Sequence, residues 1–282
     1  MGEPGTILVI GATGTTGRRL AVRLREHGAD VLVGSRQPGR VDPALGDPVL
    51  FDWADPKTFA AAVSGVERLY LLRPSGFGTE GIETFLDVAH RSGVRRVVLL
   101  HSAVAGSAGM PAIPAAVERI MPEWTILCPS WFMQNFLGDH PTARTIRDRG
   151  EIATATGEGC VGFVDADDIA DVAACALLAA EPLNRGCVLT GPEALSYPRI
   201  VEIIGAVSGR RIRYMELTAE QLTENWMAAG LPEPAARIGT ELDLAIRAGE
   251  YDYTTTTVEE ITGHRPRSFD EFARVNRAAW QG

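Results

Sequence analysis

Lysine is almost absent from this chain of 282 residues, because Lys57 is the single lysine among 27 basic residues. This scarcity removes lysine from nearly every candidate catalytic position. Cysteine is also scarce, and the four cysteines are widely spaced without a Cys-x-x-Cys pair or a histidine at metal-ligand spacing. We therefore expect no metal site, and Cys175, in an alanine-rich apolar run, is typical of a small buried thiol.

Long hydrophobic runs are missing as well. No stretch approaches the roughly 18 apolar residues that cross a bilayer, and the run Ile7–Ile10 lacks a basic flank and is too short for a signal peptide. Excess positive charge is absent too, since the formal net charge is −9. This balance weighs against nucleic-acid binding, which needs a basic surface. We expect a cytoplasmic monomer or homodimer that acts on a small molecule, without membrane or nucleic-acid contact.

The first half of the chain alternates short apolar runs with helical stretches. This alternation predicts βαβ units, and so an α/β fold with a Rossmann-type doubly wound parallel sheet. The expected domains are a dinucleotide-binding Rossmann domain over 1–190, in which 130–160 lines the cleft, and a smaller, mostly helical substrate lobe over 191–282. The expected strands are Ile7–Ile10, Val31–Val33, Val49–Phe51, Leu69–Leu72, Val97–Leu100 and Thr125–Leu127, and the expected helices lie near 14–27, 56–63, 79–92 and 112–121.

After Pro129 the rhythm changes. The segment Ser130–Leu137 is aromatic-rich, and Glu151–Gly159 has the pattern of a hairpin or of a strand with a glycine turn. Asp167–Ala180 is an alanine-rich helix with Asp165 as a candidate N-cap. Strands are further expected at Cys187–Thr190 and Arg211–Glu216, and helices at 197–208, 218–229, 233–248 and 268–280.

The strongest functional signal is a glycine-rich turn between the first strand and the first helix. Gly11 permits the tight turn, Gly14 lets the backbone approach a pyrophosphate, and Gly17 allows close packing of the helix on the sheet. The free amides and the helix dipole supply the anion site. The spacing is G-x-x-G-x-x-G, and we expect the whole turn to bind the dinucleotide, through Gly11, Thr13, Gly14, Thr15, Thr16 and Gly17.

The end of the second strand indicates which dinucleotide binds. An NAD site places an acidic residue there for the ribose 2′-hydroxyl, but this strand ends in Ser35 and Arg36. Arg36 can pair with a 2′-phosphate while Ser35 adds a donor. The sequence therefore favours NADP(H) as the cofactor, although an exposed surface arginine is the alternative for Arg36.

Residues that follow the other strands are expected at the same edge of the sheet, where such ligands bind. Asp52 and Trp53 follow the third strand, on the adenine side, although Trp53 could equally close the core beneath a loop. Arg73 and Pro74 follow the fourth strand, and His101 and Ser102 follow the fifth, nearer the nicotinamide.

Four further stretches resemble a known family, the NmrA-like atypical short-chain dehydrogenase/reductases of the ergot-alkaloid (festuclavine dehydrogenase-like) type. They are Leu127–Phe136, Val161–Ala170, Leu189–Glu193 and Thr262–Phe269, which accompany the turn Gly11–Gly17. The resemblance implies a Rossmann core, NADPH binding, and reduction of C=N, activated C=C or quinone substrates. Some relatives bind the dinucleotide as redox sensors without turnover.

In this family the segment Cys128–Phe136 flanks the nicotinamide and the substrate cleft. The resemblance thus implies cofactor contacts from Pro129 and Phe132. Trp131 and Phe136 offer flat apolar surface to a substrate, although they could instead plug the seam between two lobes. His140 and Tyr197 are further candidates on the substrate side.

The catalytic pair of the orthodox short-chain dehydrogenases, Tyr-x-x-x-Lys, is missing. The positions about 13 and 17 residues beyond Ser102 are Ala115 and Arg119. Hydride transfer remains feasible, because the cofactor carries the hydride and the protein must mainly position the acceptor. The candidate catalytic residues are His101, Ser102 and Asn135, with His101 alternatively a structural histidine.

These features together predict an NADPH-dependent reductase of an aromatic or polycyclic acceptor, with a role in bacterial secondary metabolism suggested by the resemblance. Two alternatives stay open. One is a non-catalytic NADP(H) sensor that acts through a protein partner, and the other is a redox-neutral isomerase or cyclase on the same fold.

Overall fold

The computed structural model describes residues 5–73, 79–102 and 112–281. Contacts divide the chain into two compact units. The first unit comprises Met1–Pro129, Ala166–Leu189 and Glu260–Gly263, and the second comprises Ser130–Asp165, Thr190–Glu259 and His264–Gly282. We expected a division at residue 190, whereas in the structure the chain crosses between the units several times.

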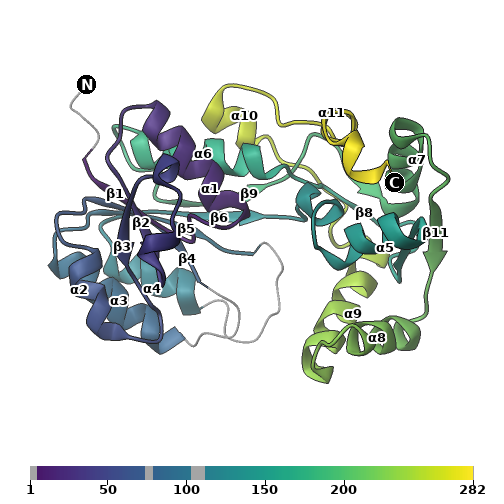
Figure 1. Cartoon of the computed structure of the whole chain (residues 1–282), viewed down its shortest axis with the longest axis horizontal. Helices are drawn as coiled ribbons and strands as arrows, with labels where there is room; N and C mark the ends of the chain where they lie inside the picture. The colour runs from purple at the N-terminus through teal and green to yellow at the C-terminus, as the bar shows by residue number, and fades with distance from the viewer. Residues whose placement is uncertain (1–4, 74–78, 103–111, 282) are drawn as a thin grey trace. The chain divides into compact units, whose positions relative to one another are not determined.

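The first unit is built on a seven-stranded sheet, in which all neighbouring strands are parallel (Figure 1). The strand order is β3-β2-β1-β4-β5-β6-β9. This arrangement confirms the predicted α/β fold with a Rossmann-type doubly wound sheet. The strands are β1 (Ile7–Ile10), β2 (Val31–Ser35), β3 (Asp47–Leu50), β4 (Arg68–Leu72), β5 (Arg96–Leu100), β6 (Glu123–Pro129) and β9 (Arg185–Leu189).

Helices cover both faces of this sheet. In Figure 1, α1 and α6 lie on one face, and α2, α3 and α4 lie on the other. Because side chains alternate along a strand, Leu8 and Ile10 join the core beneath α2–α4, while the equally buried Ile7 and Val9 point to the opposite face. The helices are α1 (Thr15–Glu26), α2 (Phe59–Ala62), α3 (Thr79–Arg91), α4 (Ala112–Ile120) and α6 (Ala166–Leu178).

Two arginines at the amino ends of the strands hold the last turn of α6. Arg96 is 3% exposed, and its Nη1 donates to the carbonyls of Ala176, Leu177 and Ala179 at 3.3, 3.2 and 2.5 Å. Arg68 also donates to the Leu177 carbonyl, at 2.6 Å. Terminal helix carbonyls lack hydrogen-bond partners within the helix and carry partial negative charge. The two arginines supply both the missing donors and the opposite charge.

The second unit surrounds a separate aromatic and aliphatic core. Phe136, Phe163 and Phe269 meet there with ring centroids 5.2–6.0 Å apart. The expected cleft segment 130–160 belongs to this unit, where Phe136 packs against Tyr197 and Phe269. The elements are α5 (Pro141–Arg149), β7 (Glu151–Thr154), β8 (Cys160–Val161), β10 (Leu195–Ser196), α7 (Tyr197–Ser208), β11 (Arg213–Glu216), α8 (Ala219–Ala228), α9 (Glu233–Arg247) and α11 (Phe269–Val275), while α10 (Thr257–Thr262) is divided between the two units.

Several elements that follow β6 in the chain differ from expectation. Helices α5 and α10 were not foreseen, and the helix expected over 268–280 divides into α11 and the short 3₁₀ helix Arg277–Trp280. Of the two alternatives for Glu151–Gly159, the strand is correct. It pairs in parallel with β11 rather than folding back as a hairpin.

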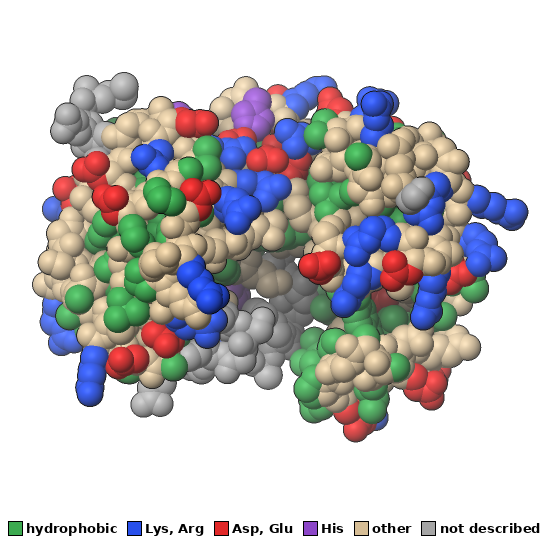
Figure 2. Space-filling view, viewed as in Figure 1, with side chains coloured by type: hydrophobic (Ala, Val, Ile, Leu, Met, Phe, Trp, Pro, Cys, Tyr) green, Lys and Arg blue, Asp and Glu red, His purple; other side chains and the backbone are tan. Residues whose placement is uncertain are grey.

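The surface of the second unit includes exposed apolar side chains on α8 and α9. Met227, Ile238 and Leu244 are 40–47% exposed, and Figure 2 shows hydrophobic side chains gathered over this pair of helices. Within the described residues, no helix combines the length and the apolar character that crossing a membrane requires.

Candidate functional site

The turn after β1 has the geometry that its glycines predict. Gly11 has φ = +81°, a region that favours glycine, and its carbonyl accepts from the Gly14 amide at 2.9 Å. A Cβ on Gly17 would lie 2.3 Å from the Gly11 carbonyl oxygen. The first turn of α1 therefore starts directly against the glycine turn, and its amino end remains available to an anion.

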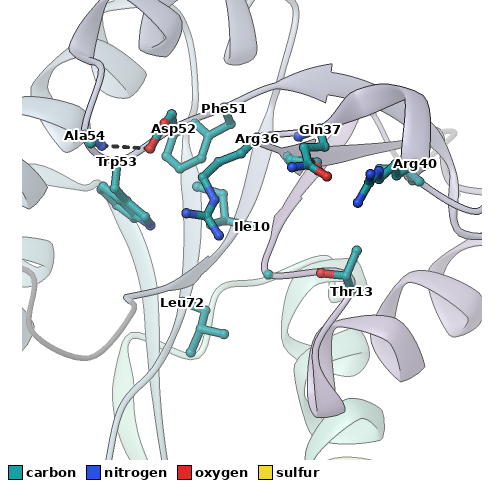
Figure 3. Close-up of a pocket in the computed structure, with 14 residues that line it drawn as sticks. Ile10, Thr13, Arg36, Gln37, Arg40, Phe51, Asp52, Trp53, Ala54 and Leu72 are labelled. Carbon is teal, nitrogen blue, oxygen red and sulfur yellow. Dashed lines mark hydrogen bonds between the residues drawn. The ribbon is translucent and has the colours of Figure 1, made fainter.

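A cavity of about 620 Å³ opens beside this turn in the first unit (Figure 3). Six of the predicted cofactor residues line it: Gly11, Thr13, Ser35, Arg36, Asp52 and Trp53. It is also lined by residues that sequence reasoning missed: Ile10, Gly34, Gln37, Arg40, Val41, Phe51, Ala54 and Leu72. Its volume is within the range of small-molecule sites.

The remaining predicted residues of the turn lead into α1. Gly14 and Thr15 are exposed, whereas Gly17 is buried. Thr16 is 3% exposed, and its Oγ1 accepts from the Tyr70 hydroxyl at 3.1 Å. The Thr16 side chain therefore holds the turn on β4 and leaves only its backbone to a ligand.

The cavity is lined by two arginines, Arg36 and Arg40, from the connection that follows β2. Arg36 and Arg40 are both exposed, and neither forms an ion pair within 4 Å among the described residues. In Figure 3, Arg36, Gln37 and Arg40 come from the connection after β2, with Thr13 across from Arg40. The Ser35 hydroxyl is 3.1 Å from the Gln37 amide, from which it accepts. Arg40 ends the short 3₁₀ helix Pro38–Arg40, and the only sequence signal for it was its place in the same connection as Arg36.

Asp52 and Trp53, which follow β3, line the same cavity. One Asp52 carboxylate oxygen accepts from the Ala54 amide at 3.0 Å, which shapes this turn. Trp53 is 9% exposed and packs edge-on against Phe51 and Phe85, with ring centroids 5.0 and 5.3 Å away. Trp53 thus closes the core, and it also lines the cavity, while its contact with a cofactor stays a prediction.

The residues that follow β4, β5 and β6 are half-buried or buried. Burial lowers the pKa of His101, and the neighbouring Arg73 lowers it further. His101 is therefore mainly neutral near pH 7. Its backbone amide donates to the Leu127 carbonyl at 2.8 Å, which continues the pairing of β5 with β6. Ser102 is half-buried, Pro129 is buried at the end of β6, and Pro74 lies outside the described residues.

The aromatic segment Ser130–Phe136 lies in the second unit. Trp131, Phe132 and Asn135 are partly exposed, and Trp131 packs edge-on against Tyr251 with centroids 4.7 Å apart. Phe136 is 1% exposed and Tyr197 is 9% exposed, both within the core. Burial leaves Phe136 and Tyr197 little surface for a substrate.

His140 has a structural partner. Its Nδ1 accepts from the Thr142 amide at 3.2 Å and caps α5. Burial and Arg144 lower the pKa of His140, although a backbone hydrogen bond with Asn135 opposes them. A neutral ring is what this cap requires, because a protonated Nδ1 could not accept.

Ala115 and Arg119, which the spacing from Ser102 predicted at the positions of the orthodox tyrosine and lysine, lie on α4, and Arg119 pairs with Glu83 at 3.0 Å. Helix α6 has two acidic residues in its first turn, Asp167 and Asp168. Asp167 pairs with Arg19 and Arg23 of α1 at 3.2 and 2.9 Å.

Comparison with known proteins gives this architecture a family. The NAD(P)H-binding family matches residues 11–180. The chain is 40% identical to the uncharacterized oxidoreductase YesF of Bacillus subtilis over 99% of its length and 98% of that protein's, and 35% identical to the agroclavine dehydrogenase of Claviceps fusiformis over 98% of both. The NADPH complex of quinone oxidoreductase QOR2 from Escherichia coli shares the fold, with a TM-score of 0.82, 19% identity, and coverage of 95% of this chain and 98% of that one.

The chain is thus an NAD(P)H-binding protein with a Rossmann fold, and it belongs to a family of NAD(P)H-dependent oxidoreductases. Within that family it belongs to the NmrA-like atypical short-chain dehydrogenase/reductases of the ergot-alkaloid reductase type.

Proposed function

We propose that this protein is an NADPH-dependent reductase of a conjugated or aromatic acceptor that contains a C=N, activated C=C or quinone group. The observation that carries the proposal is the cavity of the first unit, which is lined both by the glycine turn and by the cations Arg36 and Arg40. The relatives of this chain support a reductive reaction, since an oxidoreductase and a clavine dehydrogenase are among them.

The residues present fit a phosphorylated dinucleotide. The amides at the start of α1 would bind the pyrophosphate, because Gly14 carries no side chain over them and Thr15 is exposed. Arg36 and Arg40 would pair with the 2′-phosphate, which a guanidinium can bind through two parallel hydrogen bonds. Asp52, Trp53 and Phe51 would border the adenine.

Bound NADPH supplies a hydride to the electrophilic carbon of the acceptor. With a neutral quinone, enone or imine, the overall reaction consumes NADPH, the acceptor and one proton, and it yields NADP⁺ and the reduced acceptor; with an iminium ion it consumes NADPH and the acceptor alone. We assign the hydrogen-bond donors for the acceptor to His101, Ser102 and Asn135. Because its pKa is lowered, His101 would donate from the neutral ring rather than as an imidazolium.

Trp131 would offer apolar surface to the acceptor. We reassign Phe132 from the cofactor to the same surface, because it is next to Trp131 in the chain and is not among the residues that line the cavity. Both are partly exposed, and flat aromatic rings suit an aromatic or polycyclic molecule. An iminium acceptor is already positive and needs no proton donor, whereas a quinone or enone gains from a hydrogen bond.

The test is NADPH absorbance followed against a panel of quinones, cyclic imines and enones. We expect oxidation with at least one class. A Gly17→Ala variant should abolish both binding and turnover, since its Cβ would meet the Gly11 carbonyl, while Gly186→Ala, with open space at its Cβ, should retain both. Tight NADPH binding without oxidation across the panel would refute the reductase and favour a sensor.

A further inference from the structure

The aromatic segment Ser130–Phe136 is held by residues from the end of the chain. At one end of the segment, Trp280 donates from Nε1 to the Phe136 carbonyl at 2.8 Å. Trp280 is 1% exposed, so this bond is shielded from water. Phe269 packs edge-on against the Phe136 ring, with centroids 5.2 Å apart.

A buried carboxylate connects the same segment to a second C-terminal residue. Asp165 is completely buried, and its Oδ1 accepts from Gln134 Nε2 at 2.6 Å. Its Oδ2 accepts from Arg267 Nη1 at 2.5 Å. A buried carboxylate is stable only when cations and donors compensate its lost hydration. Arg267 therefore stabilises the carboxylate whose other oxygen, Oδ1, orients Gln134.

The backbone next to Asp165 also pairs with this segment. The Val164 amide donates to the Trp131 carbonyl at 2.8 Å, and the Met133 amide donates to the Val164 carbonyl at 2.9 Å. Phe132 and Val164 form a parallel bridge. The backbone around Trp131 and Phe132 is thus held by Val164, the neighbour of Asp165 in the chain, while the Gln134 side chain is held by the Asp165 carboxylate itself.

We propose that Arg267 and Trp280 are positioning residues, which act through Asp165–Gln134 and through the Phe136 carbonyl to set the geometry of Trp131–Asn135 for the acceptor. The inference rests on the proposed function, since it assigns the acceptor surface to that segment. All these contacts lie within the second unit. None of the residues that line the cofactor cavity takes part.

Two consequences separate this role from general stability. Misplacement of a reacting group by about 1 Å can cost up to about 100-fold in rate, so loss of the Arg267 contact should lower kcat/KM for the acceptor by about 10- to 100-fold. The Kd for NADPH should stay within about twofold, because its cavity belongs to the other unit.

The test compares Arg267→Gln with Arg265→Gln, a nearby arginine that is exposed. Arg267→Lys, which keeps the positive charge, should recover part of the lost kcat/KM. Trp280→Phe keeps an apolar ring but removes the Nε1–H donor, and it serves as the milder variant if Arg267→Gln does not fold. Loss of NADPH affinity in step with kcat/KM would overturn the positioning role.

A readout without activity completes the experiment. In protein labelled with 5-fluorotryptophan, Trp131→Phe identifies the Trp131 fluorine resonance. We expect Arg267→Gln and Trp280→Phe to shift or broaden it, and Arg265→Gln to leave it unchanged. An unchanged resonance in both test variants would refute the inference. If the wild type oxidises no NADPH with any acceptor, the proposed function fails, and the fluorine spectrum alone decides the positioning role.

Discussion

Arg36 and Arg40 present two cations to the cavity of the first unit, and the choice of dinucleotide should depend on them. A charge-assisted hydrogen bond contributes about 1.5–3 kcal/mol. We therefore expect Arg36→Ala to raise the Kd of NADPH by roughly 10- to 100-fold and to leave that of NADH unchanged. Isothermal titration calorimetry with both nucleotides measures this, with the exposed Arg91→Ala as control. Equal affinities of the unmutated protein for the two nucleotides would contradict the assignment.

Asp243 of α9 is a second residue whose environment leads to a prediction. Burial raises the pKa of its carboxyl to about 6, although a hydrogen bond from the Ala155 amide at 2.9 Å opposes the shift. The unfolded chain ionises this group near its ordinary value of 3.8. As pH rises from about 4 to above 6, the native state should therefore lose up to about 3 kcal/mol of stability relative to the unfolded state, and below about pH 4 this cost vanishes.

Asp243→Asn removes the ionisation and keeps an oxygen that can accept from Ala155. The melting temperature of the variant, minus that of the wild type, should rise between pH 4 and pH 7. Differential scanning calorimetry in matched buffers gives this difference. A difference that does not change with pH would show that the Asp243 carboxyl titrates normally.

At the scale of elements, the cap of α6 by Arg96 is a stabilising contact between a strand and a helix. Arg96 also pairs with Glu123 at 2.8 Å. Arg96→Met keeps the apolar stem but leaves the α6 carbonyls and Glu123 without this donor, and we expect a loss of about 2–4 kcal/mol. The adjacent Arg95 is 75% exposed and 3.8 Å from Glu123, so Arg95→Met should cost less than about 1 kcal/mol. Urea denaturation of both variants measures the difference, and equal losses would contradict the capping role.

The helices that were not foreseen have weak sequence signals. In α5 only Ala143 and Ile146 are buried, so no apolar stripe marks it, and its start depends on Pro141 and the His140 cap. Helix α10 is only six residues long. The strands and helices of the first unit, in contrast, carry continuous apolar runs or clear helical periodicity, and they were predicted within a few residues.

At the scale of the whole molecule, the second unit is assembled from three separate stretches of chain. A fragment ending at residue 190 would keep Phe136 and Phe163 but lose Phe269 and Trp280, which help to bury them. We expect this fragment to bind the dye ANS strongly, because it exposes apolar surface, whereas the full chain should not. Hydrogen exchange over 130–165 provides a second measurement. Protection equal to that in the full chain would show that the segment folds without its C-terminal partners.

The sequence alone determined those features that depend on neighbouring residues. The glycine turn, the strand before it and the arginine after β2 are local patterns, and the parallel sheet follows from their alternation. The same patterns identified part of the cavity wall, including Thr13, Arg36 and Asp52.

Only the tertiary structure decided which distant residues meet. Thr16 is held by Tyr70, 54 residues away, and Asp165 by Arg267, 102 residues away. Phe136 and Tyr197 are as apolar or aromatic as a substrate surface requires, but packing placed them in the core. Burial and pairing across such separations arise from the fold as a whole, because a local pattern fixes which face of an element is apolar and not what covers it.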